Sequence, residues 1–359
     1  MDIRTYIARF TETAHLQGLH NEQIEECISY ARNLLQKGLP VILDQEHFAL
    51  LVGYDYGYIL ALSNVPELYY KTFQIPKNNG KSRTIDEPYP SLKEIQTWIL
   101  NNVLTPAAKQ FVSPVAKAFV PGKSLRDNAK FHKNKKQVVA LDIQDFFGSI
   151  HFGAVYGAFE KMGYSTSVST LLTRLCLLKN SLPQGAPTSP MLSNIVFKCI
   201  DDGIFHYCSA RGIMYTRYAD DMVFSSDDMD ISRLIAYVKM RVENFKMHIN
   251  EKKTKVMGRG SRQNVTGVVV NDKLQVSRDY RMKIRQEMHF VLKYGLIDHF
   301  ARVKDIPSWV KNPIHYAKHL YGKVCFVLQI NPKDNVFMFY KMWLKEQIVQ
   351  CRQLCQQEE

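Results

Sequence analysis

The sequence lacks the long apolar runs of a secreted or membrane-spanning protein. No stretch of its 359 residues approaches the ~20 consecutive apolar residues that a spanning helix needs. Charged side chains at Asp2, Arg4 and Arg9 interrupt the N-terminus, where a secretory signal needs a continuous apolar segment. We therefore expect a soluble, cytoplasmic protein with no membrane partner.

The sequence also lacks paired cysteines, and it has fewer acidic than basic residues. Its seven cysteines are scattered, and no two of them form a CxxC pair, which excludes the usual patterns of zinc and dithiol redox sites. Lys and Arg number 47 against 34 Asp and Glu, for a formal net charge of +13. A basic surface favours a polyanionic partner such as nucleic acid, although charge alone is a weak indication.

Three acidic residues are the first indication of chemistry. Asp220 and Asp221 lie between two runs of strand-forming residues in the segment 215–225, which predicts a hairpin with both at its turn. A third carboxylate, Asp142, ends the apolar run 138–141, which predicts a buried strand. The adjacent pair alone would suggest an ordinary Asp-rich turn, whereas three acids at two strand ends suggest an oxygen-rich site for Mg²⁺.

Such a site suits one reaction in particular. Mg²⁺ is usually held by one or two carboxylates together with substrate phosphates. Two ions roughly 3.5–4 Å apart can activate an attacking hydroxyl and stabilise the leaving oxygen in a phosphoryl transfer. Asp142, Asp220 and Asp221 are therefore the candidate catalytic residues and metal ligands.

Three segments resemble successive palm motifs of reverse transcriptases, in the order that the family has them. They are residues 141–150 (LDIQDFFGSI), 182–190 (LPQGAPTSP) and 218–221 (YADD). Residues 128–132 (NAKFH) and 265–267 (VTG) resemble the NAxxH and VTG elements of bacterial retron reverse transcriptases. The similarity runs from about residue 73 to about residue 271 and, more loosely, to the C-terminus.

This resemblance implies an α+β fold of the right-hand polymerase type, with fingers, palm and thumb. Helical spacing of apolar residues in the first part of the chain predicts a helical N-terminal extension over residues 1–65. Residues 66–275 would form the fingers and palm. From about Ser277 the pattern is again helical and begins with clustered basic residues, which predicts a helical thumb over residues 276–359 that grips an RNA–DNA duplex.

The resemblance also implies contacts with the incoming nucleotide. Lys81 and Arg83, on a predicted fingers hairpin, would cover the triphosphate, and Phe147 would exclude a ribose 2′-hydroxyl. A backbone group of Ile143 would lie beside the metal. A solvated basic surface is the alternative for Lys81, Arg83 and the lysine run around Lys253. The expected nucleotide-binding residues are Lys81, Arg83, Phe147, Gln184, Gly185 and Lys253, the last assisting departure of pyrophosphate.

The two retron-type elements imply contacts with RNA. By resemblance, Asn128 and His132 of the first, and Val265, Thr266 and Gly267 of the second, would bind the template RNA. A lone histidine is otherwise more often structural.

The predicted function is RNA-templated DNA synthesis from dNTPs with two Mg²⁺ ions, for which Mn²⁺ could substitute. The retron resemblance implies a cognate structured non-coding RNA as template and primer, and a branched RNA-linked DNA (msDNA) as product. It also implies a cognate effector protein of toxin or nuclease type and a role in phage defence. Two alternatives stay open, an intron-type or diversity-generating reverse transcriptase and a scaffold that binds an RNA–DNA hybrid and restrains a partner toxin.

Overall fold

The computed structural model describes residues 3–76, 80, 82–303 and 306–357, with side chains described up to residue 350. Among these residues, no helix is both long enough and apolar enough to cross a membrane.

Helices dominate the two ends of the chain, and strands are concentrated in its middle. In chain order the elements are α1 (Ile3–Leu16), α2 (Asn21–Gln36), α3 (Gln45–Val52), α4 (Tyr56–Asn64), η1 (Pro66–Tyr69), β1 (Tyr70–Pro76), β2 (Ser82–Pro88), α5 (Pro90–Ile99), η2 (Leu100–Leu104), α6 (Thr105–Phe111), α7 (Leu125–Ala129), η3 (Lys130–His132), β3 (Gln137–Asp142), α8 (Phe152–Met162), α9 (Thr166–Cys176), α10 (Ser189–Ser209), β4 (Met214–Tyr218), β5 (Asp221–Ser226), α11 (Ile231–Glu243), η4 (Glu251–Lys253), β6 (Lys255–Gly258), β7 (Asn264–Val265), β8 (Val268–Val269), β9 (Gln275–Val276), α12 (Arg278–Tyr294), α13 (Leu296–Arg302), α14 (Pro313–Ile330) and α15 (Asn335–Gln357). This mixture of helices and antiparallel strands agrees with the expected α+β class.

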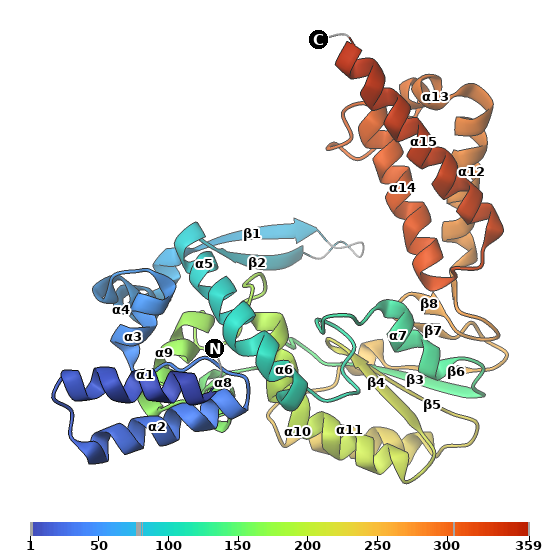
Figure 1. Ribbon diagram of the computed structural model, residues 1–359. Coiled ribbons are helices and arrows are strands. Elements are labelled where there is room, and N and C mark those ends of the chain that lie inside the picture. The colour runs from blue at the N-terminus through green and yellow to red at the C-terminus, as the bar shows by residue number, and fades with distance from the viewer. Residues whose placement is uncertain (1–2, 77–79, 81, 304–305, 358–359) are drawn as a thin grey trace.

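A four-stranded antiparallel sheet in the order β4-β5-β3-β6 lies at the centre of the chain's fold (Figure 1). Successive side chains of a strand point to opposite faces, so each strand serves two cores. Val139 and Leu141 of β3 pack into one hydrophobic cluster, and Val138 packs into the other. The sheet therefore separates two apolar cores.

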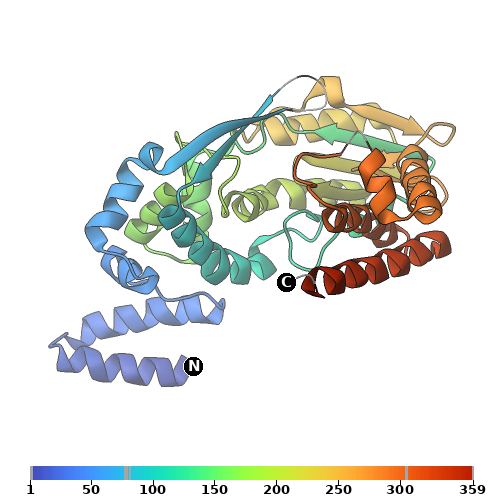
Figure 2. The same ribbon diagram turned by 90° about the horizontal axis from the view of Figure 1, so that it is seen from above.

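The two cores draw on different parts of the chain. The larger one contains buried residues of α2 to α5 and α8 to α11, and the other contains residues of α7, β7 to β9 and α12 to α15. In Figures 1 and 2 the bundle of α12 to α15 lies at the opposite end of the molecule from α1 to α4. Helix α12 begins where the sequence predicts, with the Ser277 side chain accepting a hydrogen bond from the backbone N–H of Tyr280.

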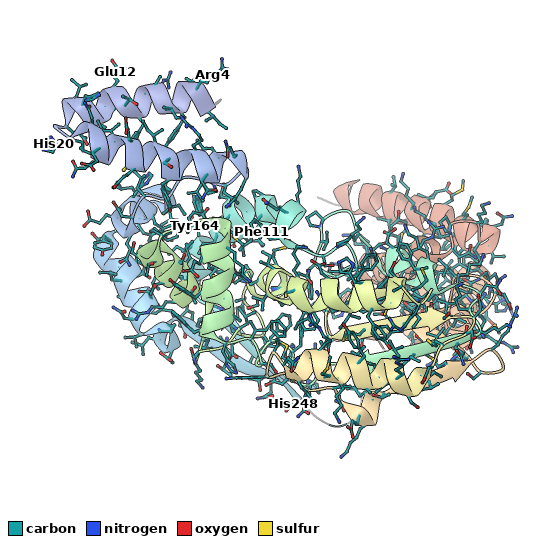
Figure 3. The ribbon with its side chains drawn as sticks, turned by 90° about the horizontal axis from the view of Figure 1, so that it is seen from below. Arg4, Glu12, His20, Phe111, Tyr164 and His248 are labelled. Carbon is teal, nitrogen blue, oxygen red and sulfur yellow. The ribbon has the colours of Figure 1, made fainter. Side chains whose placement is uncertain are left out.

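The two N-terminal helices form a hairpin that projects from the rest of the chain. Figures 2 and 3 show this pair apart from the sheet, with Arg4, Glu12 and His20 marking it in the second view. Helix α2 begins at Asn21, and its cap is His20, because the Gln23 side chain accepts a hydrogen bond from the His20 backbone N–H. Asn21 itself is the first residue of the helix.

Strands β1 and β2 form an antiparallel hairpin in which Ile75 lies opposite Arg83. The sequence predicted two short strands in this region, and the structure confirms them. Strand β2 leads directly into α5, where Pro90 takes the first helical position.

Candidate active site

The three candidate carboxylates converge at one end of the central sheet. Asp142 is the last residue of β3 and lies opposite Asp221, the first residue of β5. Ala219 and Asp220 form the turn between β4 and β5, so the predicted hairpin is confirmed and Asp220 lies at its turn, but Asp221 already belongs to β5. The backbone N–H of Ile143 donates a hydrogen bond to the Asp220 carbonyl at 3.0 Å and so links the two strand ends.

The electrostatics of this cluster are unfavourable without a cation. Burial, followed by the charges of Asp220 and Asp142, raises the pKa of Asp221 to about 6. Burial also raises the pKa of Asp220, with Asp142 adding to the effect and Lys253 and Arg83 opposing it. Like charges held together in a partly buried site disfavour the ionised form. A bound cation would relieve that conflict.

Lys253 already partners one of the three acids. Its Nζ lies 2.7 Å from Oδ2 of Asp142, whose side chain is only 9% exposed. Within the described part of the chain, no group of three or more His, Cys, Asp or Glu side chains has the arrangement of a metal site. The donor chemistry nevertheless fits a hard divalent cation, because carboxylate oxygens are its preferred ligands and the pKa shifts of Asp220 and Asp221 indicate uncompensated negative charge.

A cavity of about 870 Å³ opens in front of the carboxylates and is bounded by the β1–β2 hairpin, the 182–184 loop and the β4–β5 turn. Several of the predicted site residues line it together. They are Arg83, Asp142, Ile143, Phe147, Gln184, Asp220, Asp221, Lys253 and Thr266. A nucleotide-sized ligand could contact all of these elements at once.

The β1–β2 hairpin contributes the positively charged side chain of Arg83 to the lining of this cavity. Arg83 is exposed on β2, and its positive charge is among the groups that counter the raised pKa of Asp220. Lys81, the other predicted triphosphate contact, lies outside the described residues.

Phe147 is half-buried at the cavity wall. Its ring centroid lies 6.4 Å from that of Phe119 and 5.5 Å from that of Phe146. Phe146 is buried in the larger core. Packing on two rings limits the movement of Phe147 and leaves its edge at the cavity.

The loop before α10 is hydrogen-bonded to strand β2. The backbone N–H of Asp86 donates to the Gln184 carbonyl at 2.9 Å. Gly185 has a φ of +143°, and a Cβ at this position would lie 2.6 Å from the Asp86 carbonyl oxygen. Only glycine allows this approach. Gln184 lines the cavity, whereas the glycine serves the contact between loop and hairpin.

Two side chains of the first retron-type element are buried. Asn128 and His132 are both 0% exposed. The two ring nitrogens of His132 lie 2.7 Å from Ser225 Oγ and 2.7 Å from Thr216 Oγ1, and burial lowers its pKa to about 3. Neither side chain has exposed surface in this structure, and their expected contact with RNA stays a prediction. His132 connects the two strands of the carboxylate hairpin from behind.

The second element is divided between core and surface. Val265 is 0% exposed, so its side chain belongs to the core, and its expected contact with RNA stays a prediction. Gly267 is exposed and Thr266 half-exposed, and both have positive φ values, 87° and 49°. Asn128 Nδ2 donates to Thr266 Oγ1 at 3.0 Å, so the two elements contact each other.

Sequence reasoning missed one charged pair behind the hairpin. Arg217 of β4 and Asp201 of α10 are fully buried and form an ion pair with Nη2–Oδ2 of 2.7 Å. An arginine in an otherwise apolar strand and an aspartate inside a mostly apolar helix were the available signals.

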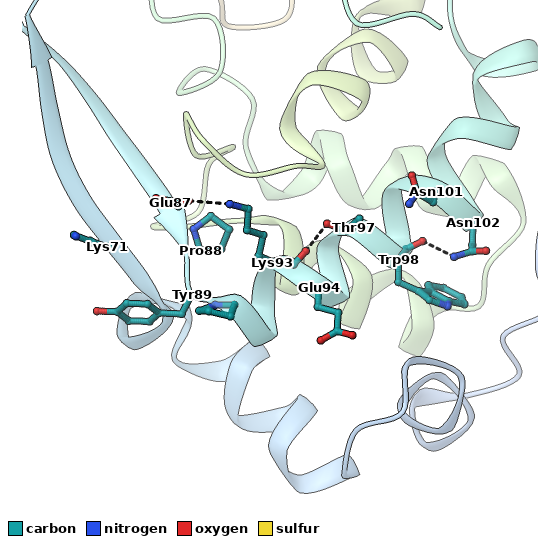
Figure 4. A pocket seen from close by; sticks show the side chains of 11 residues that line it. Lys71, Glu87, Pro88, Tyr89, Lys93, Glu94, Thr97, Trp98, Asn101 and Asn102 are labelled. Atoms are coloured by element: carbon teal, nitrogen blue, oxygen red, sulfur yellow. Dashed lines mark hydrogen bonds and ion pairs between the residues drawn. The ribbon is translucent and has the colours of Figure 1, made fainter. Parts of the chain in front are cut away.

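A second cavity, of about 770 Å³, lies outside the carboxylate site. It is formed where β2 runs into α5 (Figure 4), and its wall includes Tyr89, Trp98 and the exposed ion pair of Glu87 with Lys93. None of the three carboxylates lines it. Its chemistry gives no reason to place catalysis there.

Comparisons with known proteins agree with this geometry. Residues 75–286 match the family described as reverse transcriptase (RNA-dependent DNA polymerase). The retron Mx65 reverse transcriptase of Myxococcus xanthus is 31% identical over 337 residues, covering 88% of this chain and 74% of that protein. The retron Ec86 reverse transcriptase of Escherichia coli is 32% identical over 274 residues, covering 75% and 84%.

Among solved structures, the chain has some likeness to telomerase from Candida albicans in complex with a fragment of telomeric RNA. The TM-score is 0.44 at 11% identity, covering 78% of this chain and 60% of that one. The chain thus spans about three fifths of the telomerase, and a likeness of this size carries no argument about activity.

Proposed function

Because this chain belongs to the retron reverse transcriptases and is an RNA-directed DNA polymerase with a right-hand fold, we propose that it copies a cognate non-coding RNA at the Asp142, Asp220 and Asp221 cluster. The supporting observation is the convergence of these acids on a cavity that Arg83, Phe147 and the 182–184 loop also line. Residues 66–275 would be the fingers and palm, 276–359 the thumb, and 1–65 the N-terminal extension.

The reaction would depend on metal held by the carboxylates. Reverse transcriptases use divalent metal ions, and here the three aspartates, with a backbone group of Ile143, would hold two Mg²⁺, with Mn²⁺ as a substitute. When bound, such ions activate the attacking hydroxyl and neutralise charge on the triphosphate. The aspartates' part is to remain ionised and fixed at the strand ends.

Other residues at the cavity would bind and select the dNTP. Arg83, with Lys81, would pair with triphosphate oxygens, for which a guanidinium fork is well shaped. Phe147 would exclude a ribose 2′-hydroxyl, and Gln184 with Gly185 would contact the nucleotide and template. Lys253 would donate a proton or a counter-charge to departing pyrophosphate.

The RNA contacts near the first retron-type element would come from its exposed residues. Phe131 is 40% exposed, and the Nζ atoms of Lys117 and Lys130 lie 5.0 and 5.4 Å from its ring centroid. The exposed Phe131 ring can stack a base, and the exposed ammonium of Lys130 beside it can bind an adjoining phosphate. Thr266 and Gly267 at the cavity rim would contact the same RNA.

The retron relatives support a more specific product. The cognate RNA would act as both template and primer, and the product would be msDNA, a single-stranded DNA joined to RNA by a branch. A cognate effector of toxin or nuclease type, a role in phage defence and a place in the bacterial cytoplasm belong to the same proposal.

The test is expression of the chain with a few hundred base pairs of its native flanking DNA, alongside the doubly substituted variant Asp220→Asn, Asp221→Asn. We expect a small DNA whose mobility shifts on ribonuclease treatment and which the variant does not make. If RNA co-purifies but no DNA forms, a scaffold function replaces this proposal. If neither appears, the retron assignment of the product is wrong.

A further inference from the structure

The carboxylate hairpin rests on a buried arginine that the proposed reaction does not yet use. Arg217 precedes the turn by two residues and is 0% exposed. Its Nε lies 2.9 Å from Asp201 Oδ1, and its Nη2 lies 2.7 Å from Asp201 Oδ2. The planar guanidinium thus meets the carboxylate in a two-pronged arrangement that fixes its orientation.

The remaining nitrogen of the same guanidinium, Nη1, contacts the turn. Arg217 Nη1 donates to the carbonyl oxygen of Ala219 at 2.9 Å. Ala219 has a φ of +58°, a left-handed conformation that is unfavourable for a residue with a Cβ and persists only when its surroundings hold it. The next carbonyl, that of Asp220, accepts from the Ile143 N–H at 3.0 Å. Both peptide groups that flank Asp220 are therefore held in place.

Neighbouring side chains contact the arginine and its partner. The Tyr215 hydroxyl donates to Asp201 Oδ1 at 2.7 Å. The guanidinium carbon of Arg217 lies 4.6 Å from the Phe197 ring centroid and 5.7 Å from that of Phe146. Phe146 in turn packs on Phe147 at the cavity wall.

A buried ion pair of this kind is weak evidence for stability, because apolar side chains of similar volume often serve a core as well. An apolar side chain could fill the space of Arg217, but it could not donate to the Ala219 carbonyl. The geometry therefore assigns the pair a task that packing alone does not explain, which is to hold the left-handed turn.

We propose that Arg217, oriented by Asp201, is a positioning residue for nucleotidyl transfer, and that it fixes the Ala219–Asp220 turn so that the Asp220 carboxylate faces Asp142. This inference rests on the proposed function of the carboxylate cluster. Displacement of a reacting group by about 1 Å can cost on the order of a hundredfold in rate, so a small loss of order at this turn has a large effect.

The deciding variant is Arg217→Lys. An ammonium keeps the charge beside Asp201, but it lacks the planar fork and cannot hold both Asp201 and the Ala219 carbonyl. We expect kcat for dNTP incorporation on an RNA template to fall roughly tenfold to a hundredfold per folded molecule. The KM for dNTP should change little, and the Mg²⁺ concentration for half-maximal activity should rise.

Tyr215→Phe is the matched control, because it removes one hydrogen bond to Asp201 and none to the turn. It should keep nearly normal kcat and an unchanged Mg²⁺ midpoint, even where its melting temperature falls as far as that of Arg217→Lys. Equal kcat and equal midpoints for Arg217→Lys and the wild type, per folded molecule, would overturn the proposal. If Arg217→Lys does not fold, Asp201→Asn is judged by the same readouts, with a smaller loss expected.

Asp220→Asn separates this inference from the one on which it rests. If Asp220→Asn still synthesises DNA, the proposed role of the carboxylates is wrong, whatever Arg217 does. If Asp220→Asn is inactive while Arg217→Lys and Asp201→Asn are kinetically normal, only the positioning role fails.

Discussion

The two sides of the β4–β5 turn differ in how their charges are balanced. The side that faces the cavity is called the front, and the side that packs on α10 is called the back. In front, Asp142, Asp220 and Asp221 gather around an open cavity, and repulsion among them contributes to the raised pKa values of the latter two. Behind, Arg217 and Asp201 are fully buried and each satisfies the other. Both regions adjoin the same turn in the folded chain.

This difference indicates what each region does. Unbalanced charge that faces a cavity disfavours the empty site and favours a ligand of opposite sign. Balanced charge in the core offers nothing to a ligand, but it fixes the direction of the groups that carry it. The turn is therefore held from behind and left available for binding in front.

Removal of one front carboxylate should have the largest effect. We expect Asp142→Asn to lower DNA synthesis by roughly 10³-fold or more, because stabilisation by a bound divalent cation amounts to several kcal/mol of the barrier. Its thermal stability should remain near that of the wild type. Single-nucleotide incorporation and a melting curve measure the two quantities. Normal DNA synthesis by this variant would show that the carboxylates facing the cavity do not hold a catalytic cation.

Loss of one partner at the back should also lower the stability of the folded protein. Asp201→Ala leaves the Arg217 charge buried without a partner, which typically costs about 3–5 kcal/mol in the free energy of unfolding. Urea unfolding followed by circular dichroism measures this cost. A loss as small as that of a surface substitution would show that the pair is not held in the core as the structure places it.

Substitution of Lys253, which contacts Asp142 at the cavity, should have a smaller effect on DNA synthesis. Its Nζ contacts Asp142 but remains exposed, so it can move to a phosphate when one is present. We expect Lys253→Met to lower kcat by roughly a hundredfold, the range of a missing general acid. Lys252→Met, one residue earlier in the same short helix η4, is the matched control and should be normal. Equal effects would mean that bulk positive charge, and not position, is what counts.

The smallest expected effect is a pH-dependent change in stability. Because the pKa of Asp221 is raised from 3.8 to about 6, the folded protein binds that proton more tightly than the unfolded chain does. The resulting stability is full below about pH 4 and is lost as the pH rises through about 6. Without divalent ions, Asp221→Asn should therefore raise the melting temperature by roughly 2–4 °C at pH 7.5, and the gain should vanish near pH 4. A gain independent of pH would contradict the assigned cause.

The front of the turn could be predicted from the sequence because its signals are local. The strand-forming runs on either side of Asp220 and Asp221 predict the hairpin, and Asp142 ends an apolar strand. The antiparallel pairing of β3 with β5 then brings the three acids together. Motif order supplied the rest of the cavity, including Phe147 and Gln184.

The back of the turn could not be predicted because its partners come from separate elements. Nothing in the sequence pairs Arg217 with an aspartate on α10, or shows that His132 is enclosed between Ser225 and Thr216. The same limit applies to Gly185, whose need for glycine arises from the Asp86 backbone of β2, which lies directly against it. Burial of a polar side chain is a property of tertiary packing, which local patterns do not encode.

The most direct test of the central claim measures metal binding and DNA synthesis on the same two proteins, the wild type and Asp220→Asn. We predict that Mg²⁺ raises the melting temperature of the wild type and supports DNA synthesis on an RNA template. The variant should show neither response while remaining folded. A variant that is stabilised by Mg²⁺ to the same extent and extends the primer at the wild-type rate would contradict the account.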